Sequence, residues 1–194
     1  PLTPLGIKEA HQAGKLLANM QLDYAFTSKL KRAQHTLNII LSYNKSTPTI
    51  VNNISLNERD YGDLIGQNKA EAAEKFGKEQ VHIWRRSYDI PPPNGESLEM
   101  TCKRTIPFFK KNILTKISNN NIIISAHGNS IRAIIMYLFK YNKEEILKTE
   151  IGWCEPWIIT FNNNKLTDFK IHNRPGSKSM SFISKNPILS AEKI

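Results

Sequence analysis

Cysteine is scarce in this sequence, and long apolar runs are missing. Only Cys102 and Cys154 occur among 194 residues, without the spacing of a metal-ligand set or a redox motif. Both are expected to be reduced thiols, and a disulfide-stapled fold is excluded. No apolar run approaches the ~20 residues that span a bilayer, and the opening Pro1–Pro4 shows no signal peptide. These absences favour a soluble, cytoplasmic protein.

Acidic residues are also few, and 27 Lys and Arg against 17 Asp and Glu leave a formal net charge of +10. Such a charge attracts anions, which could be nucleic acid, an acidic membrane surface or a small phosphorylated substrate. The lysines are scattered along the chain, and no nucleic-acid-binding motif accompanies them. We therefore expect a small phosphorylated substrate as the partner, and neither nucleic acid nor a membrane.

The length and the 40% hydrophobic composition suit one α/β core. We expect a single domain over residues 1–172 and a polar tail of little periodicity over residues 173–194. Strand-like and helix-like segments alternate, which is typical of a mostly parallel sheet with helices on both faces. Strands are expected at 23–27, 49–51, 122–126, 157–161 and 166–171, and helices at 3–17, 28–41, 68–76, 79–88, 97–113, 129–139 and 143–149.

Two local features refine this arrangement. Pro107 should kink the long helix that begins at Ser97, because proline lacks the backbone N–H that a helix interior needs. The last two strands are expected to form a hairpin across Asn162–Asn164 and to lie at an edge of the sheet.

The chain is organised around residues 122–132, a β-branched apolar run that ends in a polar turn and reopens as a helix. Three consecutive isoleucines suit a strand buried on both faces, and Asn129 or Ser130 can cap the helix that follows. Backbone N–H groups at such a helix start are unpaired and favour an anion. His127 would stand beside a phosphate bound there, and Gly128 would let it approach closely.

Arg32, Glu58 and the Arg85–Arg86 pair are the other candidates from the residues alone. In a sheet covered on both faces they could converge at the carboxyl ends of the strands. A guanidinium matches phosphate or carboxylate oxygens in a bidentate way, but a solvated helix face is the simpler alternative for each arginine. The remaining histidines are expected at the surface or in packing: His11, His35, His82 and His172.

Five segments, taken in order, carry a family resemblance. They are residues 28–37 (SKLKRAQHTL), 56–71 (LNERDYGDLIGQNKAE), 84–86 (WRR), 94–98 (NGESL) and 126–130 (AHGNS). Together they resemble the cofactor-dependent phosphoglycerate mutases of the histidine phosphatase superfamily, from residue 1 to about residue 161. The NERxYG and WRR patterns are typical of the mutases in particular, whereas AHGN is shared with related phosphatases.

This resemblance implies a phosphoglycerate-mutase-like α/β fold and an isomerase of glycolysis and gluconeogenesis. The implied reaction interconverts 3-phosphoglycerate and 2-phosphoglycerate through a phosphohistidine, with 2,3-bisphosphoglycerate as primer and no metal. A homo-oligomer also fits the family.

The resemblance further implies two catalytic residues, with Glu58 as proton donor and acceptor and His127 beside the transferring phosphoryl group. Phosphoryl transfer needs positioning and cationic donors more than covalent chemistry from the protein, which agrees with these residue types. The implied substrate-binding residues are Arg32, Arg59, Asp60, Tyr61, Lys69, Arg85, Arg86, Gly128 and Asn129.

One family segment has no counterpart in this sequence. The family begins with a central strand ending in Arg-His-Gly-Glu-Ser, which lies beside the one equivalent to 122–126 and carries the phosphorylated histidine. We therefore expect an N-terminally incomplete, truncated domain, as a fragment or a degraded gene product, with little or no mutase activity of this chain alone.

Competing interpretations are a phosphomonoesterase of the same superfamily and an inactive anion-binding remnant. A stretch before Asn94 that is shorter than in the long bacterial mutases favours phosphatase side activity, and residues 151–156 depart from the usual family loop.

Overall fold

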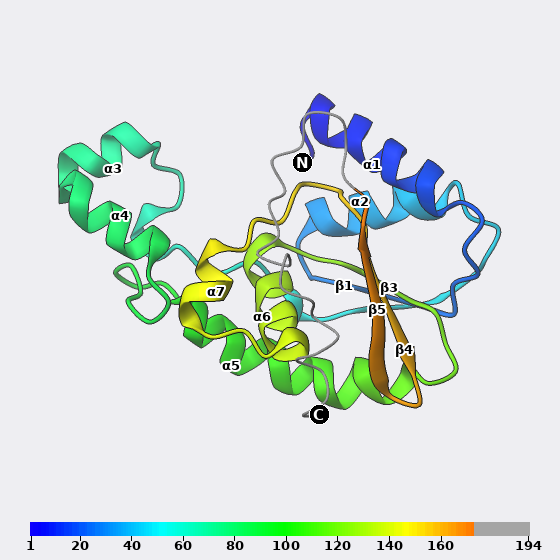
Figure 1. Ribbon diagram of the computed structural model, residues 1–194. Coiled ribbons are helices and arrows are strands. Elements are labelled where there is room, and N and C mark those ends of the chain that lie inside the picture. Colours follow the sequence, from blue (N-terminus) through cyan, green and yellow to red (C-terminus); the bar gives the residue numbers. More distant parts are fainter. Residues whose placement is uncertain (173–194) are drawn as a thin grey trace.

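The computed structural model describes residues 1–172, in which strands and helices alternate (Figure 1). The polar tail expected at 173–194 lies outside these described residues. No helix in the described part is long and apolar enough to cross a membrane. In chain order the elements are α1 (Pro4–Leu17), β1 (Tyr24–Thr27), α2 (Lys31–Leu41), β2 (Thr49–Asn52), α3 (Lys69–Phe76), α4 (Lys78–Arg86), α5 (Leu98–Phe108), β3 (Ile122–Ser125), α6 (Gly128–Phe139), α7 (Lys143–Lys148), β4 (Trp157–Asn162) and β5 (Lys165–Ile171).

Three parallel strands form the central sheet in the order β2-β1-β3. β1 lies in the middle, with Phe26 opposite Val51 on one side and Ile124 on the other. Parallel neighbours need crossover connections, which here contain α2 and then the segment from α3 to α5. The expected parallel sheet is confirmed for these strands, and their carboxyl ends lie at one edge.

The C-terminal strands β4 and β5 form a separate antiparallel pair. Their turn contains Asn163 and Asn164, both at positive φ, a conformation that asparagine tolerates better than most residues. The expected hairpin is therefore confirmed. It differs from the expectation in one respect, because among the described residues no strand pairing joins it to the parallel sheet.

Helices cover both faces of the parallel strands, with α1 and α2 on one side and α5 and α6 on the other (Figure 1). Successive side chains of a strand point to opposite faces, and β3 follows this rule. Ile123 packs with the α1 and α2 residues, whereas Ile122 and Ile124 pack against the cluster from α5 and α6. The alternation explains why a continuous run of isoleucines suits this position.

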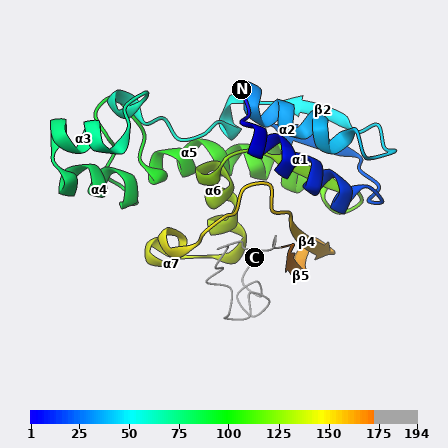
Figure 2. The ribbon, with the colours of Figure 1, turned by 90° about the horizontal axis from the view of Figure 1, so that it is seen from above.

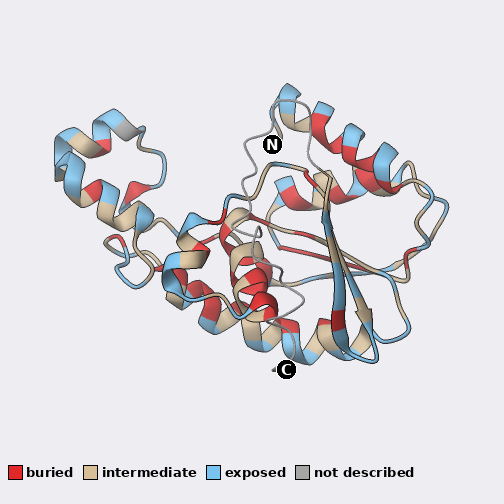
Figure 3. Cartoon of the chain, in the orientation of Figure 1, coloured by how far each residue is buried: buried red, intermediate tan, exposed pale blue. Residues whose placement is uncertain are grey.

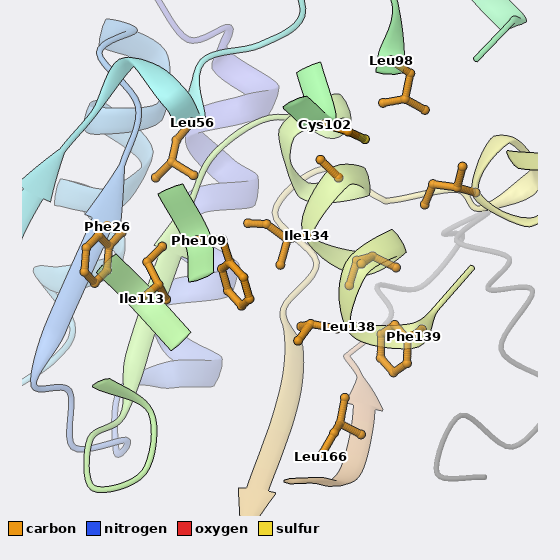
Figure 4. Close-up of a cluster of buried hydrophobic side chains, with 13 residues drawn as sticks. Phe26, Leu56, Leu98, Cys102, Phe109, Ile113, Ile134, Leu138, Phe139 and Leu166 are labelled. Atoms are coloured by element: carbon orange, nitrogen blue, oxygen red, sulfur yellow. The ribbon is translucent and has the colours of Figure 1, made fainter. Parts of the chain in front are cut away.

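The main hydrophobic core lies between the sheet, α5 and α6, where the buried residues concentrate (Figure 3). Phe26 of β1 contributes from the sheet, Phe109 and Ile113 from the segment after α5, and Leu166 from β5 (Figure 4). This core fixes the position of β3 relative to α6. It thereby sets the strand-to-helix turn that contains His127.

The isoleucines of β3 are half-buried, so the expectation of a strand buried on both faces is wrong in degree. Among residues 1–172, β3 is hydrogen-bonded to β1 alone, and β4 to β5 alone. A cavity of about 990 Å³ is lined by both β3 and β4, including Ile123, Ile124, Ile158 and Ile159. Side chains that face this cavity lack packing partners there, which leaves them partly exposed.

The α3 and α4 helices form a hairpin that projects from the rest of the molecule in both views (Figures 1 and 2). It has a small hydrophobic cluster of its own, with Leu64, Ala72 and Val81 buried and Phe76 and Trp84 packed against them. Gly77 joins the two helices at a φ of 84°, where a side chain would be strained. Arg85 and Arg86 lie at the end of α4 nearest the body.

Two helix details refine or differ from the sequence expectations. Regular α-helix geometry ends at Phe108, one residue after Pro107, and continues as a π-helical turn over Phe109–Ile113, so the helix changes its hydrogen-bond pattern next to the proline. The second helix begins at Lys31 rather than Ser28. The Ser28 hydroxyl instead accepts the N–H of Leu30 at 3.1 Å, which holds residues 28–30 in a turn before the helix.

Candidate active site

The carboxyl ends of β1 and β3 lie side by side and carry the first part of the site. Thr27 is paired with Ser125, and the Thr27 hydroxyl donates to the Ser125 carbonyl at 2.8 Å. Just beyond these ends, Ser28 Oγ and His127 Nε2 are hydrogen-bonded at 2.8 Å. Both side chains are buried. Ser28, which precedes His127 by 99 residues in the sequence, thus fixes the orientation of the His127 imidazole.

His127 is also the N-cap of α6, so the expectation that Asn129 or Ser130 caps this helix is wrong. The chain turns earlier, and Ser130 supports the turn by accepting the His127 N–H at 3.1 Å. The Asn129 N–H points at the Glu58 carboxylate, with 3.2 Å between the nitrogen and Oε1. The positive end of the helix therefore faces a carboxylate of the protein itself.

Glu58 is held through one of its two carboxylate oxygens. Oε1 accepts from the Arg59 N–H at 2.7 Å, from the Asn129 N–H, and from Asn129 Nδ2 at 2.9 Å. The same Nδ2 donates to the Tyr61 hydroxyl at 3.2 Å. Among the described residues, Oε2 has no hydrogen-bond donor, and it lies 3.8 Å from where a Cβ on Gly128 would stand. One oxygen is thus anchored, and the other is free to exchange a proton.

Burial lowers the pKa of His127 from its ordinary 6.5 to about 4, and the positive charge of Arg32 adds to this effect. Glu58 acts in the opposite direction and Arg104 in the same direction as Arg32, both more weakly. The imidazole is therefore neutral at pH 7. A neutral ring can approach an anion as a hydrogen-bond partner and can take up a proton once the anion is in place.

We expect the stability of the protein to fall as the pH drops from about 6.5 to about 4, partly because of His127. In that window the unfolded chain binds a proton on this residue and the native state does not, so acid favours unfolding. His127→Gln should lose less stability than the wild type between pH 7 and pH 4.5. Urea unfolding at both pH values measures the difference, and His35→Gln, at an exposed position on α2, is the matched control. Equal losses in wild type and His127→Gln would contradict a buried neutral imidazole.

Six of the sequence-predicted site residues line the cavity described above: Arg32, Glu58, Tyr61, His127, Gly128 and Asn129. Arg32 is exposed near the start of α2. Arg85 does not line the cavity but has its guanidinium 5.6 Å from the Tyr61 ring centroid, and its Nε is buried without a partner. Arg86 is exposed and pairs at 3.5 Å with Glu150, which does line the cavity.

The other three predicted residues take different positions. Arg59 is buried, and its guanidinium donates to the Trp84 and Arg85 carbonyls, each at 3.4 Å, and stacks on Tyr61. These contacts tie the end of α4 to the loop that carries Glu58. Asp60 is exposed and accepts the Gly62 N–H at 2.8 Å. Lys69 is the first residue of α3, and its side chain lies outside the described part of the structure.

Four further residues contact the site and were not singled out from the sequence. Ser28 bonds His127, and its place just past a strand end is a signal that could have revealed it. Arg132 lines the cavity and donates to the Thr149 carbonyl at 3.0 Å, and a charge within an apolar helix is a comparable signal. Glu96 and Arg104 contact the Glu58 loop from α5 and the residues before it. No spacing in the sequence indicates these last contacts.

The remaining histidines lie away from this cavity. His11 Nδ1 is hydrogen-bonded to the Tyr43 hydroxyl at 2.9 Å, and the side chains of His35 and His82 are exposed on α2 and α4. His172 follows β5. Within residues 1–172, no group of three or more His, Cys, Asp or Glu side chains is placed to hold a metal ion.

Comparison with known proteins places this geometry in context. The family model of the histidine phosphatase superfamily (branch 1) matches residues 1–173. A 2,3-bisphosphoglycerate-dependent phosphoglycerate mutase from Parvibaculum lavamentivorans is 48% identical over 166 residues, which is 84% of this chain and 79% of the relative. The protein of the same name from Nitrobacter hamburgensis is 49% identical over 165 residues, covering 83% of this chain and 80% of its own.

Solved structures agree on the fold. The α-ribazole phosphatase from Shigella flexneri matches with a TM-score of 0.74 at 24% identity, over 90% of this chain and 84% of that one. Bacillus stearothermophilus YhfR matches with a TM-score of 0.76 at 19% identity, over 86% of this chain and 82% of that one.

Proposed function

Because the chain belongs to branch 1 of the histidine phosphatase superfamily, and within it to the family of 2,3-bisphosphoglycerate-dependent phosphoglycerate mutases, we propose that it interconverts 3-phosphoglycerate and 2-phosphoglycerate. One observation supports this activity above the others. The Glu58 carboxylate is anchored at Oε1 and open at Oε2, in the same cavity as the neutral His127 and the cationic Arg32. A proton carrier therefore lies beside a site suited to a phosphoryl group.

The phosphoryl group is proposed to bind between Arg32 and His127. Arg32 provides an exposed guanidinium at the cavity, and His127 is a buried imidazole held by Ser28. Charge develops on the peripheral oxygens during phosphoryl transfer, and fixed donors stabilise it without reorganising. The His127 ring is neutral when free and would gain a proton next to a dianion, so its contribution grows as negative charge accumulates.

Glu58 is proposed to move the proton of the substrate hydroxyl. A hydroxyl that accepts a phosphoryl group must lose its proton, and a hydroxyl that is released must regain one. Oε2 is free for this exchange, whereas Oε1 is occupied by three N–H donors. The same carboxyl group can then act as base in one half-reaction and as acid in the other. The phosphohistidine chemistry itself is the part implied by family membership.

The substrate's other anionic groups are proposed to bind Tyr61, Lys69, Arg85 and Arg86. Tyr61 is hydrogen-bonded to Asn129 and stacked by Arg59, so its ring is fixed at the boundary between the body and the α3–α4 hairpin. Arg85 has a buried Nε with no partner, which is a donor available to an anion. Arg86 shares Glu150 with Arg132 and can exchange this exposed ion pair for a ligand at small cost.

These residues also fit the primer that the relatives' names imply, 2,3-bisphosphoglycerate. The donor set at and near the cavity is cationic, because Arg32 lines it, Arg85 lies over Tyr61 and Arg86 pairs with Glu150, and two phosphates require such a set. When bound, the primer would supply a phosphoryl group to the histidine that the family carries in its Arg-His-Gly-Glu-Ser strand, a segment with no counterpart in this sequence. A cytoplasmic location follows from the proposed metabolic role.

A coupled assay on the full-length protein tests this proposal. With 3-phosphoglycerate and a trace of 2,3-bisphosphoglycerate, 2-phosphoglycerate should form faster than inorganic phosphate is released. Phosphate release without isomer would indicate a phosphomonoesterase, the alternative that the shorter stretch before Asn94 favours. If neither 2-phosphoglycerate nor inorganic phosphate forms, and the affinity for the ligand falls steeply as the salt concentration is raised, the protein is a non-specific anion binder.

A further inference from the structure

Arg104 makes six hydrogen bonds, all directed at the segment that carries Glu58 or at Glu96. Nη1 of Arg104 lies 3.5, 3.0 and 3.1 Å from the carbonyl oxygens of Ile54, Ser55 and Asn57. Nη2 donates to the carbonyl of Glu58 itself at 3.1 Å. Arginine is suited to this task because its planar guanidinium presents five donors in a fixed geometry.

Glu96 completes the arrangement from the other side. Its carboxylate pairs with Arg104 in a bidentate way, with Nε at 2.9 Å from Oε1 and Nη2 at 2.8 Å from Oε2. Oε2 also accepts the Asp60 N–H at 3.1 Å. Burial acts to raise the pKa of Glu96, but hydrogen bonds from Arg104 and the Asp60 N–H outweigh it and the pKa is lowered. The carboxylate is thus charged and ordered near neutral pH.

The two side chains therefore bracket Glu58. Arg104 binds carbonyls on the N-terminal side of Glu58 and its own carbonyl, and Glu96 binds the N–H two residues further on. The pair is about three-quarters buried, with 24% and 22% of the side chains exposed, so solvent screens it less than a surface ion pair. Thr105 adds a hydrogen bond at 2.8 Å to the Ser55 carbonyl.

We propose that Glu96 and Arg104 are a positioning pair for Glu58, which sets the distance of its carboxylate from Asn129 and from the bound substrate. This inference rests on the proposed function, because it assigns the pair a role in proton transfer. The pair touches no substrate. It acts through the backbone of residues 54–60, whose position determines whether Oε1 can reach both N–H donors of Asn129.

Positioning predicts a specific kinetic signature. A displacement of about 1 Å costs roughly 10²-fold in rate when a reacting group is moved. Arg104→Lys, which keeps the charge but cannot bridge four carbonyls and a carboxylate, should lower kcat by about 10²-fold and change KM little. Glu96→Gln keeps the shape and one acceptor, and should lower kcat by about tenfold. Lys103→Gln is the matched control, since Lys103 is on the same helix and, within residues 1–172, forms its ion pair with Glu99 rather than with the Glu58 segment.

A double-mutant cycle with Glu58→Gln separates positioning from general destabilisation. If Arg104 acts through Glu58, then Arg104→Lys should have little further effect on kcat once Glu58 is glutamine. Equal effects of Arg104→Lys in both backgrounds would overturn the proposal. Glu96→Gln, as the milder variant, provides the same cycle if Arg104→Lys does not fold.

The side-chain amide of Asn129 gives a readout that needs no turnover. Its NMR signal should shift in Arg104→Lys and Glu96→Gln and stay in place in Lys103→Gln, because Nδ2 bonds Glu58 Oε1. The positioning pair would be refuted if the wild type is active, kcat of Arg104→Lys and Glu96→Gln equals that of the wild type, and the Asn129 signal does not shift. The proposed function would then still stand. The kinetic measurements use the protein with the family's phosphohistidine segment present. If that protein converts no phosphoglycerate, the proposed function is refuted, and the Asn129 signal alone then decides whether the pair holds Glu58.

Discussion

Glu58→Gln is expected to lower kcat of the mutase reaction by about 10²–10⁴-fold, the range typical for loss of a general acid–base group. Glutamine has nearly the same volume and retains a carbonyl oxygen, so the Arg59 and Asn129 donors keep an acceptor. Its amide nitrogen, however, cannot take a proton from a substrate hydroxyl or return it. The chemistry should therefore fail while binding persists.

The measurements for Glu58→Gln are kcat in the coupled assay and the Kd of 3-phosphoglycerate by calorimetry. We expect the Kd to change by less than about threefold, since the residue is assigned to the proton rather than to the anion. Glu144→Gln, which removes an exposed carboxylate on α7, is the control and should match the wild type. An activity of Glu58→Gln close to that of the wild type would exclude Glu58 as the proton carrier.

Gly62→Ala is expected to destabilise the protein by about 3 kcal/mol or more, placing it among the severe substitutions. Gly62 has a φ of 51°, and a Cβ at this position would lie 2.1 Å from the Pro93 carbonyl oxygen and 2.5 Å from the Gly95 nitrogen. Both obstacles are backbone atoms, so neither can rotate away. The loop that follows Glu58 would have to separate from residues 93–95, and activity should fall with stability.

Gly66→Ala is the matched control for this substitution. Gly66 has a φ of 78°, but nothing lies within 4 Å of its Cβ position, so only the conformational cost of about 1–2 kcal/mol remains. Guanidinium chloride unfolding of the two variants isolates the contribution of the close approach between the loops. Equal losses for Gly62→Ala and Gly66→Ala would show that these loops are not packed as described.

The backbone framework was largely predictable because its signals are local. The run Ile122–Ile124 followed by a polar turn predicts a strand leading into a helix, and Gly77 predicts the end of α3, as observed. The half-burial of the isoleucines does not follow from this local run, although the absence of the family strand that lies beside 122–126 predicts lost core contact there. It depends on which strands border β3 and on the cavity, which are properties of the assembled fold.

Some site residues were likewise predictable from local sequence patterns, and others depend on the assembled fold. Glu58, His127 and Asn129 stand in a recognisable pattern, and the structure brings them together. The sequence pattern predicts Ser28 only as the start of a helix. Its hydrogen bond to His127 spans 99 residues and leaves no periodic trace in the sequence. Arg104 looks like an ordinary charge on an amphipathic helix, and only its contacts 46 to 50 residues back distinguish it. A sequence pattern indicates residue types and their spacing along the chain, whereas the roles of Ser28 and Arg104 depend on which residues lie near them in space.

The projecting α3–α4 hairpin has a thermodynamic consequence for ligand affinity. Its own cluster contains only three buried apolar residues, so it should open at a lower free-energy cost than the main core. Arg85 and Arg86 lie on this hairpin, and a ligand that bridges them to the body stabilises the folded state of the hairpin by mass action. Binding and the local folding of the hairpin are then a single linked equilibrium. Ala72 and Val81, which touch no ligand, would tune affinity through it.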